Sequence, residues 1–210
     1  NIPLIADLEG CFEHSNQYIK RGVTAALTVG CKGVIFGDGG RDGLHQMLGV
    51  MEVANRIKSA RMAAMETRKP LFLVARTDAI SMGNIIARPF EEAVTRANGY
   101  LNAGADLVHI PGVQNLDVIK QLRDEINGPL SITVSHKEAP NLKHYAEAGL
   151  TAVSLGTGLM RSALYDMKIK AKALMLTGEF LHLDNTISEN DLSDILTRPA
   201  SDPRSIATTA

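Results

Sequence analysis

The sequence lacks the features that mark several common classes of protein. Among its 210 residues it has no tryptophan, only 4% aromatic residues, and two cysteines, Cys11 and Cys31. Two cysteines are too few for a disulfide scaffold, and their spacing fits no zinc-binding template. No apolar run approaches the roughly 20 residues that a membrane-spanning helix needs. We therefore expect reduced thiols, a cytoplasmic location and no membrane partner.

The sequence also lacks an excess of charge of either sign. It has 22 Lys and Arg residues against 23 Asp and Glu residues, for a formal net charge of −1. Proteins that bind nucleic acid duplexes usually carry a basic surface, so we expect no nucleic-acid partner. The content of 45% hydrophobic and 21% charged residues is typical of a globular protein.

Short apolar runs alternate along the chain with segments of helical periodicity. Each run has about four to six residues, which is typical of buried strands in a parallel sheet. The predicted strands are 3–6, 33–36, 71–75, 107–110, 129–134 and 151–155, and the predicted helices are 15–29, 50–65, 89–103, 116–125 and 142–148. Glycines follow three of these helices, at the position that favours a left-handed residue. This alternation predicts an α/β fold with a parallel sheet.

Six such units suit either a doubly wound sheet or part of a (β/α)₈ barrel. No G-x-G-x-x-G motif follows the first strand, so a dinucleotide-binding fold has no direct support. Polar residues follow most of the predicted strands, as the active sites of barrels require. We therefore predict a (β/α)₈ TIM barrel whose first one or two units are missing from this chain. The predicted barrel domain is 1–175, and a C-terminal helix and tail form 176–210.

Two carboxylates lie at the end of the first predicted strand. Side chains alternate along a strand, so Asp7 and Glu9 share one face. Two carboxylates this close repel each other unless a cation or a proton intervenes. Mg²⁺ prefers oxygen ligands and needs only one or two carboxylates. The pattern predicts a site for Mg²⁺, with Mn²⁺ as a substitute, and a pair of solvated loop acids is the alternative.

An arginine closes the third predicted strand, in Val74-Ala-Arg-Thr-Asp-Ala79. An arginine on an inward strand face needs an anion, and its planar fork fits a carboxylate. A substrate carboxylate is one candidate partner of Arg76. An internal ion pair with Asp78 or Glu9 is the other.

Further along the chain, two positions are candidates for substrate binding. Ser135 follows the fifth predicted strand, where it could touch a substrate carboxylate. Gly156 begins a glycine-rich turn before a helix, which is a plausible anion site, with a plain tight turn as the alternative. His109 lies within its strand and is more typical of a hydrogen-bonded core residue than of a catalytic one.

Five segments resemble, in order, the motifs of the isocitrate lyase and phosphoenolpyruvate mutase superfamily. They span about residues 2 to 175. Each motif alone is modest evidence for the family, but five motifs in the same order are strong evidence. The segments are Ile5-Ala-Asp-Leu-Glu-Gly10, Gly33-Val-Ile-Phe-Gly-Asp-Gly39, Val74-Ala-Arg-Thr-Asp-Ala79, Ala103-Gly-Ala-Asp-Leu-Val-His-Ile-Pro-Gly112 and Ala148-Gly-Leu-Thr-Ala-Val-Ser-Leu-Gly156.

The resemblance implies a homo-oligomeric barrel, a dimer or tetramer, that makes or breaks a C–C or P–C bond beside a small 2-oxo or 2-hydroxy acid. It implies a pyruvate-type enolate stabilised by Mg²⁺ and an arginine. By position, Asp7 is the direct metal ligand, Glu9 holds metal-bound waters, and Arg76 clamps the substrate carboxylate. Asp38 is the third candidate for the metal site.

The sequence departs from the family pattern at one metal-site position and in one loop. The family glutamate before Asp38 is Gly37, and the loop 39–46 lacks the cysteine that isocitrate lyases use as a general acid. His45 is the candidate acid–base in that loop, with a solvated histidine as the alternative. Oxaloacetate decarboxylase or phosphonopyruvate hydrolase activity is therefore an alternative to lyase activity. A catalytically degenerate barrel that binds a ligand or only assembles is a third possibility.

Overall fold

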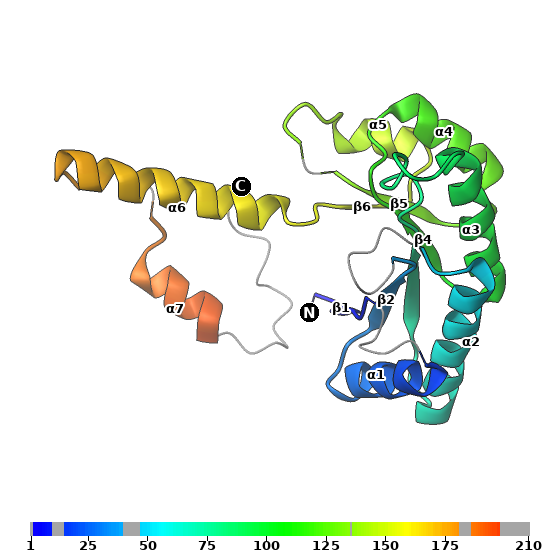
Figure 1. The fold of residues 1–210 in the computed structure, drawn as a ribbon. Helices are drawn as coiled ribbons and strands as arrows, with labels where there is room; N and C mark the ends of the chain where they lie inside the picture. The colour runs from blue at the N-terminus through cyan, green and yellow to red at the C-terminus, as the bar shows by residue number, and fades with distance from the viewer. Residues whose placement is uncertain (1, 10–14, 40–46, 135, 181–185, 198–210) are drawn as a thin grey trace. The chain divides into compact units, whose positions relative to one another are not determined.

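The computed structural model describes residues 2–9, 15–39, 47–134, 136–180 and 186–197 (Figure 1). The chain divides into two compact units. One is Pro3–Gly156, and the other comprises Asn1–Ile2 with Thr157–Ala210. These units divide after Gly156, whereas the boundary predicted from the sequence lies at residue 175, inside a helix of the second unit. The predicted domain division stays a prediction.

The unit Pro3–Gly156 contains a parallel sheet of six strands. They are β1 (Ile5–Asp7), β2 (Gly33–Gly37), β3 (Phe72–Arg76), β4 (Leu107–Ile110), β5 (Leu130–Thr133) and β6 (Ala152–Ser154). Each strand pairs with the next one in the sequence, in the order β1-β2-β3-β4-β5-β6 (Figure 1). A doubly wound sheet reverses its strand order, so this topology excludes it. The α/β prediction is confirmed as a partial barrel, and the complete eight-stranded barrel stays a prediction.

A helix follows each of the first five strands. They are α1 (Asn16–Thr28), α2 (Val50–Thr67), α3 (Pro89–Ala103), α4 (Leu116–Glu125) and α5 (Leu142–Glu147). The sequence explains the ends of α3. Pro89 occupies its first turn with Glu91 and Glu92, where a fixed φ and negative charge stabilise a helix start. Gly104 ends it with a φ of 111°, which disfavours other residues.

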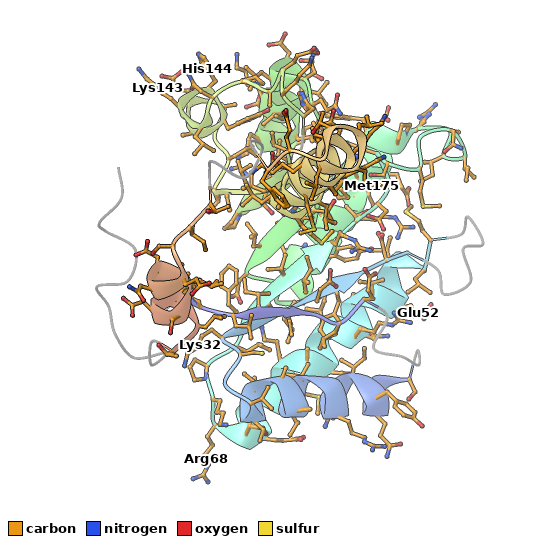
Figure 2. The ribbon with its side chains drawn as sticks, turned by 90° about the vertical axis from the view of Figure 1, so that its left-hand side faces the viewer. Lys32, Glu52, Arg68, Lys143, His144 and Met175 are labelled. Atoms are coloured by element: carbon orange, nitrogen blue, oxygen red, sulfur yellow. The ribbon has the colours of Figure 1, made fainter. Side chains whose placement is uncertain are left out.

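The hydrophobic core lies between the sheet and these helices. Alternate strand residues point into it, among them Val34, Leu73, Val108 and Ile132, all fully buried. Because strand side chains alternate, the intervening residues face the other side of the sheet. Exposed polar side chains lie on the outside, where Lys143 and His144 of α5 and Arg68 after α2 point away from the sheet (Figure 2).

The second unit contains α6 (Gly158–Thr177) and α7 (Glu189–Thr197), and neither helix has a buried residue. Large apolar side chains of α6 are exposed, including Leu159, Tyr165 and Met167. No helix in the described part of the chain is long and apolar enough to cross a membrane.

Candidate active site

The face of the sheet opposite the helices carries a polar pocket at the carboxyl ends of the strands. Each of the six strands contributes a residue to the lining of this pocket. The cavity measures about 410 Å³ and is lined by Asp7, Ile35, Arg76, Asp78, Ser81, His109, Pro111, Thr133, Ser154 and Gly156. The strand alternation that buries Val34 and Leu73 against the helices also points Ile35 and Arg76 to this side.

Arg76 forms an ion-paired cluster with three carboxylates, two of which, Asp7 and Asp78, line the pocket. Its Nη1 donates a hydrogen bond to Glu9 Oε1 at 3.2 Å, and its Nη2 donates to Glu9 Oε2 at 2.9 Å. Nη2 also donates to Asp78 Oδ2 at 3.3 Å, while Asp7 Oδ2 lies farther away, 3.8 Å from Nη1. The internal ion pair that the sequence left open is therefore present, with both predicted partners. Nε lies 3.2 Å from Asp78 Oδ1, yet it has no hydrogen-bond partner among the described residues.

The cluster holds more negative than positive charge. Burial lowers the pKa of Arg76, but its hydrogen bond with Glu9 and the charges of Asp78, Glu9 and Asp7 raise it above its usual range. Burial raises the pKa of the Asp78 carboxyl, and the attraction of Arg76 offsets this rise only in part. When all three carboxylates are ionised, a single guanidinium leaves two negative charges uncompensated.

A tight turn after β1 joins the two predicted metal-site carboxylates. The backbone N–H of Glu9 donates to Asp7 Oδ1 at 3.0 Å. Glu9 has a φ of 47°, in the left-handed region that residues other than glycine rarely adopt. The turn leaves Asp7 Oδ2 directed toward the pocket side, with Arg76 as its ion-pair neighbour. Asp7 and Glu9 are therefore brought together as the sequence predicted, but Glu9 is already bound to arginine.

The side chain of His109 joins the floor of the pocket to β5. Nδ1 lies 2.9 Å from Ser131 Oγ, and Nε2 lies 2.9 Å from Thr133 Oγ1. Burial lowers the pKa of His109 to about 4, with a further contribution from the charge of Arg76. His109 is therefore neutral near pH 7, as in the hydrogen-bonded core residue that the sequence favoured, although it also lines the cavity.

Asp38 lies on the other side of the sheet from the pocket residues of β2 and β3. It is fully buried, and Oδ2 accepts hydrogen bonds from Tyr100 at 2.9 Å and Arg96 at 3.2 Å. Oδ1 accepts the backbone N–H of Asp78 at 2.9 Å. The predicted metal role of Asp38 does not fit this geometry, because both oxygens have partners and successive strand residues face opposite sides. Asp38 instead fixes the backbone that carries Asp78.

The other predicted site residues have different outcomes. Gly156 lines the pocket, and its backbone N–H donates to Ser154 Oγ at 3.1 Å. His45 and Ser135 lie outside the described residues, so their predicted roles stay predictions. Thr133 and Ser154 line the pocket but were not predicted. Their signal was present in the sequence, because each occupies the last position of its strand.

The fold and the pocket together define an α/β enzyme-type site at the carboxyl ends of parallel strands. The chain belongs to the phosphoenolpyruvate phosphomutase family, which it matches over residues 1–175. It is 28% identical over 183 residues to a phosphoenolpyruvate phosphomutase of Streptomyces hygroscopicus, with 80% of the chain and 54% of that protein covered. It is 26% identical over 156 residues to an oxaloacetate decarboxylase of Pseudomonas entomophila, with 73% and 50% covered.

The same fold occurs in the solved structure of oxaloacetate acetylhydrolase in complex with the product oxalate. The TM-score is 0.78 at 19% identity, over 92% of this chain and 66% of the other. The chain spans about half the length of the relatives that it matches in sequence. These comparisons confirm the family that the five motifs indicated.

The donor set of the pocket fits a divalent cation that is held mainly by one carboxylate. The described residues contain no cluster of three or more His, Cys, Asp or Glu side chains arranged for a metal. Mg²⁺ needs only one or two carboxylates, because it keeps several of its waters. Asp7 Oδ2 accepts no hydrogen bond from the described residues, and its ion-pair neighbour, Arg76 Nη1, lies 3.8 Å away. The excess negative charge of the cluster also favours a cation.

Proposed function

We propose that this chain carries the active site of a Mg²⁺-dependent lyase that makes or breaks a C–C bond beside the carboxylate of a small 2-oxo or 2-hydroxy acid. The observation that carries the proposal is the presence of Asp7 and Arg76 in one pocket at the strand ends. One supplies an oxygen ligand for a hard cation, and the other supplies a cation for a carboxylate. Family membership supports the same class of chemistry.

In this proposal, Asp7 would hold the divalent cation, Mg²⁺ or Mn²⁺, and Glu9, once free of Arg76, would contact waters bound to the cation. The bound cation supplies positive charge that stabilises an oxygen on which negative charge develops. Asp78 stays beside Arg76 and keeps the guanidinium in the pocket. The carboxylates of Asp7 and Glu9 would therefore interact both with a bound cation and with Arg76.

Arg76 binds and orients the substrate carboxylate in this proposal. Its Nε has no hydrogen-bond partner among the described residues, so it has a donor to offer. The ring of His109 lines the pocket and is neutral near pH 7, so it adds no second positive charge beside Arg76. The hydroxyl groups of Thr133 and Ser154 complete the polar lining. His45 is the proposed acid–base, and Ser135 and Gly156 are proposed to contact the substrate.

Oxaloacetate decarboxylation is the second candidate. Several relatives of the chain are named oxaloacetate decarboxylase, and the chain covers about half of the length of each. The two candidate reactions share the carboxylate clamp and the cation, and they differ in whether CO₂ or a larger fragment leaves. A direct assay for CO₂ release from oxaloacetate therefore separates them.

We also propose that the protein is a cytoplasmic homo-oligomer, a dimer or tetramer. The free thiol of Cys31 is buried, which suits a reducing compartment. The exposed apolar side chains of α6 suit burial against another chain. Light scattering coupled to size-exclusion chromatography tests the assembly.

The first test is thermal unfolding with Mg²⁺ and oxalate, a planar dicarboxylate that mimics a pyruvate enolate. Selective binding to the folded state raises Tm by mass action. We expect a rise that requires both Mg²⁺ and oxalate and disappears in Asp7→Asn. The matched control is Asp124→Asn, at an exposed position of α4, which should keep the full rise. A cooperative transition without any shift would favour the catalytically degenerate barrel.

A further inference from the structure

Gly37 and Arg76 are direct neighbours in the sheet. They are register partners of the parallel strands β2 and β3, so side chains at the two positions point to the same face. That face carries the pocket, which Arg76 lines. A side chain at position 37 would therefore stand beside the guanidinium.

The guanidinium of Arg76 occupies the space that such a side chain needs. A Cβ atom at position 37 would lie 2.8 Å from Arg76 Nη2 and 3.1 Å from its Cζ and Nε. These separations are well inside the roughly 3.5–4.0 Å of an optimal van der Waals contact. The nearest atom, Nη2, is the nitrogen that donates to both Glu9 and Asp78. A methyl group at position 37 would thus displace the atom that closes the ion-paired cluster.

Space, and not backbone conformation, is what requires glycine at this position. Gly37 is a strand residue and is not among the glycines with positive φ in the described part of the chain. Alanine is therefore compatible with its backbone. The atoms in the way belong to the end of a long, flexible side chain, so an alanine would move Arg76 and leave the sheet in place.

We propose that Gly37 is a positioning residue that decides how Glu9 is shared between Arg76 and a divalent cation. Because position 37 has no side chain, the guanidinium lies against β2 and holds both oxygens of Glu9. The cation then depends on Asp7, and Glu9 joins it only after its bonds to Arg76 break. This inference rests on the proposed function for the cation, but its first half concerns Arg76 and Glu9 alone.

The binding experiment uses Mn²⁺, whose free form is measured directly by electron paramagnetic resonance. We expect Gly37→Ala to bind Mn²⁺ more tightly than wild type, by about threefold to tenfold, because a carboxylate is released from its ion pair. The matched control is Gly49→Ala, where an added Cβ meets no atom within 4 Å. The control should bind as wild type does. Equal affinity in Gly37→Ala and wild type would overturn the proposal.

A second background identifies the carboxylate that is responsible. In Glu9→Gln, the change Gly37→Ala should no longer increase Mn²⁺ affinity, since no carboxylate remains to be released. If the gain persists without Glu9, then Gly37 acts through another group and the proposal is wrong. Asp7→Asn should lose Mn²⁺ in every background. If wild type binds no Mn²⁺, or binds it equally well without Asp7, the proposed metal function fails.

A metal-free measurement keeps the inference about Gly37 independent of that outcome. The Nε–H resonance of Arg76 in ¹⁵N-labelled protein reports the surroundings of the guanidinium. We expect Glu9→Gln to shift this resonance in the wild-type background, and to leave it nearly unchanged in Gly37→Ala, where the pair is already broken. An equal shift in both backgrounds shows that Gly37 does not control the pair, whether or not a cation binds.

Discussion

Arg76 binds both carboxylate oxygens of Glu9, with Nη1–Oε1 and Nη2–Oε2 distances of 3.2 and 2.9 Å. The two residues come from the ends of different strands, β3 and β1, which are separated in the sheet by β2. The guanidinium therefore spans the strand between them. This bridge crosses β2 at Gly37, where the absence of a side chain leaves room for the guanidinium.

The planar fork of Arg76 makes a specific prediction for the conservative change Arg76→Lys. A lysine keeps the charge but cannot bind a carboxylate in two places. We expect kcat/KM for the 2-oxo acid substrate to fall by about 10²-fold or more, chiefly through KM, if Arg76 clamps the substrate carboxylate. Steady-state kinetics measures the change. Arg88→Lys, at an exposed position before α3, is the control and should retain wild-type kinetics.

The pH dependence of stability follows from His109. Its pKa is about 4 in the folded protein, because of burial and of Arg76, and near 6.5 in the unfolded chain. Between these values the unfolded chain binds a proton that the folded protein does not, so stability falls as the pH falls. We expect a slope approaching about 1.4 kcal/mol per pH unit between pH 6 and pH 4.5. Above about pH 7.5, a full unit above the pKa of the unfolded chain, the contribution of His109 is nearly constant.

Denaturant unfolding at several pH values measures this slope. His109→Asn should flatten it, even though the loss of a buried side chain lowers stability at every pH. His144→Asn is the matched control, because His144 is exposed on α5 (Figure 2), and it should leave the slope unchanged. A slope that survives the removal of His109 would assign it to another group.

The buried network around Asp38 gives a prediction for stability alone. Asp38 accepts hydrogen bonds from Arg96 and Tyr100, with no exposure to solvent. Asp38→Asn leaves the Arg96 charge without this buried partner, so we expect the free energy of unfolding to fall by about 3 kcal/mol. Tyr100→Phe removes two hydrogen bonds, the one that the hydroxyl donates to Asp38 and the one that it accepts from Arg96, and should cost about 1–3 kcal/mol. Tyr18→Phe, on a partly exposed side chain, should stay within about 0.5 kcal/mol of wild type.

Much of the fold could be predicted from the sequence because the strands are short, apolar and regularly spaced. The run 107–110 was predicted with the bounds of β4, and the run 33–36 falls one residue short of β2. Hydrophobic periodicity carries this information locally. An eight-stranded barrel needs more strands than these six, so its closure stays a prediction.

The candidate site was predictable only in part, because its contacts join strands that lie far apart in the sequence. Strand alternation predicted that Asp7 and Glu9 share one face, but β1 ends at Asp7, and a tight turn brings Glu9 beside it instead. The same rule separates Gly37 from Asp38, and it explains why Asp38 faces the helices and not the pocket. The choice of Glu9 as a partner of Arg76 depends on the register of β2 against β3, which sequence periodicity does not specify.

Asp78 illustrates a site residue whose functional placement opposes stability. Burial raises its pKa, so its charged form is penalised in the folded state, and this penalty is relieved as the pH falls through the raised pKa. Asp78→Asn removes the charge. We therefore expect Tm to rise relative to wild type at pH 8, with a smaller rise at a lower pH that approaches the raised pKa. We also expect kcat to fall, because Arg76 loses a carboxylate that holds it in the pocket. Thermal unfolding at the two pH values, together with an activity assay, tests both parts. A variant that is less stable at pH 8 would show that the ion pair with Arg76 outweighs the cost of burial.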